Sequence, residues 1–191
     1  AYTALHEVLR GYDAAAPEPL SRVFYLSTAP SFFPVIIEQL GRADLTTCAG
    51  GVRCVIEKPF GTSLAEARQL NRDVLAVLSE DQVFRIDHYL GKETVQNLLA
   101  FRFANGMFEP LWNRNYIDNV QITASEDLGI GTRAGYYDNA GALRDLVQNH
   151  MLQVLCLLCM EPPVSFTADD VRDEKVKVLH AIPAPTPEQV P

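Results

Sequence analysis

The chain has 191 residues, 48% of them hydrophobic, which suits one globular domain or parts of two. Sixteen Lys and Arg against 24 Asp and Glu give a net charge of −8, which argues against a nucleic-acid platform. Any phosphate ligand must therefore be held by a local group of cations. No apolar run approaches the roughly 20 residues that a membrane helix needs, so no membrane partner is expected.

Strands and helices are predicted to alternate in the first part of the chain. Short apolar runs predict strands at 23–26, 54–56 and 83–86, and helical patterns are predicted at 4–10, 31–40 and 64–78. Gly41 is expected to cap the second of these helices, and Ser63 with Glu66 forms a capping box before the third. This order predicts a parallel sheet with crossovers, the back half of a doubly wound, Rossmann-like α/β fold.

In the second part of the chain, the predicted elements no longer alternate regularly between strand and helix. Helices are predicted at 92–105, 142–160 and 169–175, a strand at 120–124, a loop at 135–141 and an extended tail at 183–191. The longest of these helices has Leu143, Val147, His150 and Val154 on one face. We place a domain boundary near residues 87–89, which divides the chain into 1–87 and 88–191.

Polar groups concentrate where the third predicted strand ends. Asp87 and His88 put a carboxylate beside an imidazole, Gly91 can supply a turn, and Lys92 opens the next helix. Ligands gather in open α/β sheets where strands end and helices begin, so this turn is a candidate binding site. The alternative is a solvated turn of mixed charge.

Two other residues allow a structural and a functional interpretation. His150 lies on an apolar helix face, where a satisfied core histidine is the alternative to a base or ligand. Lys58 follows the second strand and precedes Pro59, and from there an ammonium can enter a cleft. A surface lysine beside a turn proline is the alternative.

Two short patterns are interpreted as structural. Cys156 and Cys159 have C-x-x-C spacing, and with Cys48 and Cys54 they could form a zinc site on paper. Buried thiols in a reducing compartment are favoured, because the C-x-x-C pair lies inside an apolar helical run. Residues 129–134 fit a loose G-x-G-x-x-A pattern, but no helix is predicted to open there, so we reject it as a phosphate loop.

Several motifs in fixed order resemble those of the glucose-6-phosphate dehydrogenase family. Residues 85–93, Arg-Ile-Asp-His-Tyr-Leu-Gly-Lys-Glu, match the family's substrate-binding signature letter for letter. Other matches are Glu-Lys-Pro-Phe-Gly at 57–61, Gln-Asn-His at 148–150, and the segments 96–98, 102–105, 112–114 and 171–178. The resemblance implies an interior segment of a longer enzyme. Residues 1–87 would be the carboxyl-terminal half of a dinucleotide-binding domain, and 88–191 the amino-terminal part of an α+β substrate and dimerisation domain.

The resemblance implies hydride transfer from C1 of glucose 6-phosphate to NADP⁺, giving 6-phosphogluconolactone, the first oxidative step of the pentose phosphate pathway. It assigns the catalytic base to His150 and the carboxylate that orients the base to Asp87. It places Tyr25 and Lys58 beside the cofactor and makes Pro59 cis. The substrate-binding positions that it implies are Lys58, His88, Tyr89, Lys92, Glu126 and Asp145, with the 6-phosphate at His88, Tyr89 and Lys92. Asp145 precedes His150 by five residues, so α-helix geometry alone does not pair the two.

NADP is the cofactor that the resemblance implies, although the residues that read the adenosine ribose lie outside this chain and leave NAD open. No metal is needed, because a histidine base and a nicotinamide acceptor complete the chemistry. The resemblance also implies a cytoplasmic location and a homo-oligomer for the full-length protein. Two alternatives stay open. One is a sugar oxidoreductase of the glucose–fructose oxidoreductase type, which shares Glu-Lys-Pro but lacks residues 85–93 as they stand here. The other is a truncated, catalytically inactive sugar-phosphate-binding fragment.

Overall fold

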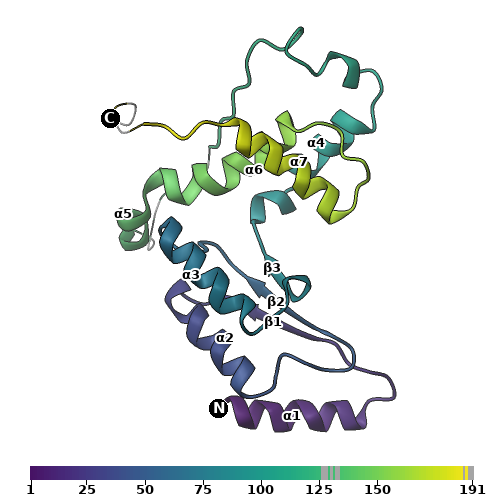
Figure 1. Cartoon of the computed structure of the whole chain (residues 1–191), viewed down its shortest axis with the longest axis vertical. Helices are drawn as coiled ribbons and strands as arrows, with labels where there is room; N and C mark the ends of the chain where they lie inside the picture. The colour runs from purple at the N-terminus through teal and green to yellow at the C-terminus, as the bar shows by residue number, and fades with distance from the viewer. Residues whose placement is uncertain (126–128, 130, 132–133, 187, 189–191) are drawn as a thin grey trace. The chain divides into compact units, whose positions relative to one another are not determined.

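A computed structural model describes residues 1–125, 129, 131, 134–186 and 188 (Figure 1). The chain divides into two compact units, Ala1–Asp87 and His88–Pro191, and each has its own cluster of buried apolar side chains. No helix in the described part of the chain is both long enough and apolar enough to cross a membrane.

Unit 1 is built on a three-stranded parallel sheet. Strands β1 (Arg22–Leu26), β2 (Val52–Ile56) and β3 (Val83–Arg85) are hydrogen-bonded in that order, with Leu26 opposite Ile56 and Ile56 opposite Arg85. The crossovers contain the helices α2 (Phe33–Arg42) and α3 (Leu64–Leu75) and the short 3₁₀ turns η1 (Pro30–Phe32) and η2 (Glu80–Gln82), and α1 (Tyr2–Ala15) precedes β1. The predicted parallel α/β sheet is confirmed.

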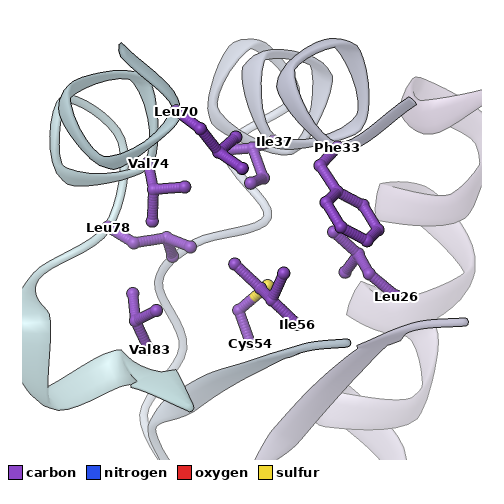
Figure 2. Close-up of a cluster of buried hydrophobic side chains, with 9 residues drawn as sticks. All are labelled: Leu26, Phe33, Ile37, Cys54, Ile56, Leu70, Val74, Leu78 and Val83. Carbon is purple, nitrogen blue, oxygen red and sulfur yellow. The ribbon is translucent and has the colours of Figure 1, made fainter. Parts of the chain in front are cut away.

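The core of unit 1 lies between one face of the sheet and the helices α2 and α3 (Figure 2). Successive side chains of a strand point to opposite faces of the sheet. Those on this face are buried, while Val23, Tyr25 and Phe84 on the other face are exposed. The buried cluster comprises Leu26, Phe33, Ile37, Cys54, Ile56, Leu70, Val74, Leu78 and Val83. In the predicted helical segment 64–78, Leu70, Val74 and Leu78 are thus buried, whereas Leu64 at its start is 67% exposed.

The helix ends of unit 1 correct two predictions. The Ser63 hydroxyl accepts from the Glu66 N–H at 3.2 Å, as a capping box requires, but the Glu66 carboxylate accepts from the N–H and hydroxyl of Thr62 instead of closing the box. Gly41 does not cap α2, which continues to Arg42, and the positive φ of 53° belongs to Asp44. Gly41 lies within the helix at a close approach, where an added Cβ would stand 2.7 Å from Cγ1 of Val77.

The regular elements among the described residues of unit 2 are all helical. The elements in chain order are η3 (His88–Gly91), α4 (Glu93–Phe103), η4 (Glu109–Leu111), α5 (Ala134–Ala142), η6 (Leu143–Met151), α6 (Leu152–Cys159) and α7 (Ala168–Ala181). Helix α6 packs against α4 and α7. Val95, Leu157 and Met160 form the centre of the core, and apolar side chains of all three helices pack against them.

Two predictions for unit 2 are wrong, and a third is correct only in part. Residues 117–125 have no regular structure, so the strand at 120–124 does not form. The loop expected at 135–141 is helix α5, with a kink at Gly141 (φ 67°, ψ 170°), so a helix does begin within the glycine pattern that we rejected for lacking one. The long helix is not α-helical throughout, because η6 is a π-helix that continues into α6. Of the residues expected on its apolar face, Leu143 and Val147 are exposed, whereas His150 is buried.

Candidate active site

The turn that begins unit 2 holds three of the predicted substrate-binding residues. His88 and Tyr89 lie in the single 3₁₀ turn η3, and Lys92 is the residue that precedes α4. The Lys92 N–H donates to the Tyr89 carbonyl at 3.1 Å, and the Gln96 side chain donates to the Leu90 carbonyl at 3.2 Å. These short-range bonds define the turn, and the Lys92 ammonium lies 3.6 Å from the centroid of the Tyr89 ring, a cation–π contact.

The π-helix η6 brings His150 to this turn. The His150 imidazole is 1% exposed and stacks on the Tyr89 ring, with centroids 4.3 Å apart and planes at 12°. The exposed His88 ring meets His150 edge-on at 4.4 Å and 68°. Residues distant in the sequence therefore place two imidazoles, a phenol and an ammonium together within unit 2.

The helix type also affects Asp145. In an α-helix, residues five apart do not lie above one another, but the i→i+5 pattern of a π-helix brings them close to the same face. Asp145 and His150 are 7% and 1% exposed, so both belong to the buried face of η6. The expectation assumed an α-helix, whereas this segment is a π-helix, and an association of Asp145 with His150 stays a prediction.

Two side chains that sequence reasoning left without a role hold the end of α6. Arg102 donates from Nη1 to the Leu157 carbonyl, and Trp112 donates from Nε1 to the Leu158 carbonyl, each at 2.7 Å. The last carbonyls of a helix lack partners within the helix, so these donors satisfy them. Burial lowers the pKa of Arg102, whose guanidinium also lies over the rings of Phe103 and Trp112. The sequence feature that could have indicated this role of Arg102 is an arginine between aromatic residues in a predicted helix.

In unit 1, the predicted cofactor residues follow the strands of the sheet. Tyr25 is 55% exposed near the end of β1, and the half-buried Lys58 follows β2. The Tyr25 hydroxyl donates to the Glu57 carboxylate, and this hydrogen bond raises the pKa of Tyr25. The Lys58–Pro59 bond is cis, as predicted. Dinucleotides bind at the carboxyl ends of parallel strands, so an accessible phenol and ammonium there fit a nicotinamide dinucleotide.

The roles of two predicted site residues, Glu126 and Asp87, stay predictions. Glu126 lies outside the described residues. Asp87 is half-buried and is the last residue of unit 1, so its orienting role toward His150 stays a prediction.

All four cysteines are free, and burial raises the pKa of Cys54 to about 11. Cys159 is exposed at the end of α6, contrary to the expected burial.

A cavity of about 420 Å³ lies in unit 1 and contains none of the predicted site residues. It is lined by η1, by the start of α2, and by Thr62, Glu66 and Asp73. The charged groups of its lining are acidic, and Glu66 is already held by Thr62, which keeps the Glu66 pKa low. Such a lining does not suit a sugar phosphate, so the candidate site remains the group around His150.

Comparison with known proteins gives two family models that match this chain. The family model described as "Glucose-6-phosphate dehydrogenase, NAD binding domain" matches residues 1–97, and "Glucose-6-phosphate dehydrogenase, C-terminal domain" matches residues 99–191. A glucose-6-phosphate 1-dehydrogenase of Rhizobium meliloti is 57% identical over 85% of this chain and 33% of its own length. That of Mycolicibacterium smegmatis is 54% identical over 98% of this chain and 37% of its own length.

Solved structures of glucose-6-phosphate dehydrogenases are also similar to this chain. A glucose-6-phosphate dehydrogenase in complex with its substrate glucose-6-phosphate has a TM-score of 0.85 and 46% identity, over 94% of this chain and 37% of that chain. The enzyme of Mycobacterium avium has a TM-score of 0.83 and 46% identity, over 97% of this chain and 39% of that chain.

The parallel sheet of unit 1 and its match to an NAD-binding domain place the chain in the class of proteins with a dinucleotide-binding α/β fold. Within that class, the two family models together cover nearly the whole chain. The chain belongs to the glucose-6-phosphate dehydrogenase family, which confirms the resemblance drawn from its motifs. It spans little more than a third of the length of the curated relatives it matches.

Proposed function

We propose that the protein containing this chain oxidises glucose 6-phosphate at C1 and reduces NADP⁺, giving 6-phosphogluconolactone. The observation that carries this proposal is the buried His150 imidazole stacked on Tyr89, with Lys92 over the same ring. Membership of the family supports it, as do relatives named glucose-6-phosphate 1-dehydrogenase at 49% to 57% identity.

His150 is the general base of the proposed reaction. Its imidazole accepts the proton of the C1 hydroxyl while hydride leaves the same carbon, so the sugar loses two electrons and two hydrogens in all. A neutral imidazole suits this step near neutral pH. Asp87 orients the ring and stabilises the imidazolium, as carboxylates do in other His–Asp pairs. Bound NADP⁺ supplies the hydride acceptor, and Tyr25 and Lys58 are the residues of this chain that would hold it.

The 6-phosphate is assigned to His88, Tyr89 and Lys92. A phosphate dianion needs several donors and positive charge within hydrogen-bond reach, and His88 and Lys92 are both exposed to receive it. The chain carries a net charge of −8, so attraction must come from this local group. Lys58, Asp145 and Glu126 complete the assignment, with the two acids accepting hydrogen bonds from sugar hydroxyls.

A reducing compartment such as the cytoplasm is proposed for the protein, because all four cysteines are free thiols. A homo-oligomeric assembly of the full-length protein is carried over from the family.

Two substitutions in the intact protein test the roles of base and phosphate ligand separately. His150→Asn should lower kcat by about 10²- to 10⁴-fold, the usual contribution of a general base, while the Kd for glucose 6-phosphate changes little. Lys92→Ala should raise that Kd by about 10- to 100-fold, since it removes a charged hydrogen-bond donor. Steady-state kinetics with NADP⁺ and calorimetric titration with the sugar phosphate measure the two effects.

The matched controls are His180→Asn and Lys177→Ala, which remove the same groups from exposed side chains of α7. Neither control should change kcat or Kd appreciably. An active His150→Asn variant would remove His150 as the base, and an unchanged affinity in Lys92→Ala would move the phosphate to another place.

A further inference from the structure

One aromatic ring serves two of the proposed functional groups in unit 2. The Tyr89 side chain is 8% exposed, and its ring stacks almost parallel to His150 at 12° and 4.3 Å. The Lys92 ammonium lies 3.6 Å from the centroid of the same ring. His88 meets Tyr89 edge-on at 5.1 Å and 67°. The phenol is thus in contact with the proposed base and with both other members of the proposed phosphate group.

A general base depends on the direction of its lone pair, so both torsions of a histidine side chain must be restricted. A hydrogen bond to one ring nitrogen restricts rotation within the plane of the imidazole, but it leaves the tilt of that plane less defined. A ring stacked in parallel restricts the tilt, because turning the imidazole out of plane loses the contact along its whole face. The Tyr89 ring supplies this second restraint to His150.

We propose that Tyr89 is a positioning residue for His150, and that its ring, independently of its hydroxyl, holds the imidazole in the plane from which it removes the proton. The inference rests on the proposed function in taking His150 as the base. It adds to the phosphate role already assigned to Tyr89, and it separates the two roles by chemical group: the hydroxyl serves affinity and the ring serves turnover.

Removing the hydroxyl and removing the ring should therefore have different kinetic effects in the intact protein. Tyr89→Phe keeps the ring, so it should raise KM for glucose 6-phosphate and lower kcat by no more than about twofold. Tyr89→Leu removes the ring, so it should lower kcat by at least about tenfold in addition to raising KM. Tyr116→Leu is the matched control, because Tyr116 is 68% exposed in the same unit, and it should change neither constant.

A spectroscopic measurement tests the stack without relying on turnover. In protein labelled with ¹³C at histidine Cε1, the ring current of Tyr89 should shift the His150 ring proton upfield from that of the exposed His180. The His150→Asn variant identifies the signal by its disappearance. The upfield shift should persist in Tyr89→Phe and be lost in Tyr89→Leu. Tyr89→Met replaces Tyr89→Leu if the latter fails to fold, since methionine fills irregular core space.

The results separate this proposal from the proposed function. An unshifted His150 signal in the unsubstituted protein, or equal kcat in the Phe and Leu variants, would overturn the positioning role while leaving the dehydrogenase in place. A shifted signal in a protein that does not oxidise glucose 6-phosphate would overturn the proposed function, and with it the role of Tyr89 in turnover. A shifted signal with the kcat loss confined to the variant without a ring would support both.

Discussion

Burial distinguishes residues of the same type in this chain, and the cysteines show it well. Cys54 lies in the core of unit 1 with none of its surface exposed, whereas Cys159 is exposed at the end of α6. Cys156 and Cys159 belong to one apolar run, which predicts burial of both thiols. Periodicity alone could not show that the helix ends at Cys159, so that one of the two thiols reaches solvent.

We expect the contribution of Cys54 to stability to fall in alkaline solution. Desolvation raises its pKa to about 11 in the folded chain, whereas the pKa of an unfolded cysteine is about 8.5. A raised pKa favours folding fully below the unfolded value, and the advantage is lost as pH rises toward the folded value. The difference in free energy of unfolding between the unsubstituted chain and Cys54→Ala, measured in urea, should therefore shrink between pH 8 and pH 10.5.

Val74→Ala provides the control for this titration. Val74 belongs to the same buried cluster and has no ionisable group. The loss in free energy of unfolding caused by Val74→Ala should therefore be independent of pH. If the loss in free energy of unfolding caused by Cys54→Ala were also independent of pH, the thiol would ionise as easily in the folded chain as in the unfolded one.

At the scale of elements, the sequence predicts best where local chemistry and tertiary packing agree. Strands β1, β2 and β3 were predicted because short apolar runs lie between turn residues, and each finds a neighbour in the sheet. Residues 120–124 have the same local character but have no strand partner among the described residues, and a strand requires one. Helix α5 was missed for the converse reason, since its glycines and tyrosines favour a loop by propensity.

Two glycines within helices should respond in opposite ways to the same substitution. Gly11 lies in α1 with no atom within 4 Å of an added Cβ, so Gly11→Ala should raise the free energy of unfolding by about 0.5–1 kcal/mol. In α2, the Cβ of Gly41→Ala would stand 2.7 Å from Cγ1 of the β-branched Val77, so the variant should be less stable by about 1 kcal/mol. Urea unfolding of each variant measures both changes.

The clash explanation for Gly41 has its own control. Removing the opposing methyl groups with Val77→Ala should relieve the clash, so the double variant Gly41→Ala/Val77→Ala should be more stable than the sum of the single changes by at least about 0.5 kcal/mol. Additive effects would show that Gly41 is not needed for the close approach to Val77.

At the scale of the whole molecule, the candidate site shows the limit of reasoning from local pattern. His88, Tyr89 and Lys92 are neighbours in the sequence, so their grouping could be predicted from one turn. That His150 stacks on Tyr89 depends on the packing of η6 beside η3, which no local pattern encodes. The family resemblance assigned a role to His150, but the π-helix that buries both it and Asp145 is visible only in the structure.

The two units have separate cores, which predicts that a core substitution acts mainly on its own unit. Ile37 belongs to the cluster of unit 1 and Leu157 to that of unit 2, both nearly fully buried, and truncating either to alanine should cost about 2–5 kcal/mol. The chain has a single tryptophan, Trp112, whose indole is hydrogen-bonded in unit 2, while the Cys54 thiol is protected in unit 1. Tryptophan fluorescence and Cys54 labelling thus report on the two units separately.

Leu157→Ala should lower the urea midpoint seen by Trp112 fluorescence more than the midpoint seen by Cys54 labelling, and Ile37→Ala should do the reverse. The reason is that a cavity raises the free energy of the folded unit that contains it, and the other cluster keeps all of its buried contacts. The exposed substitution Val164→Ala, at 94% exposure in unit 2, should move neither midpoint and serves as the control. Equal shifts of both probes in both core variants would contradict the prediction, because the units would then unfold as one cooperative body.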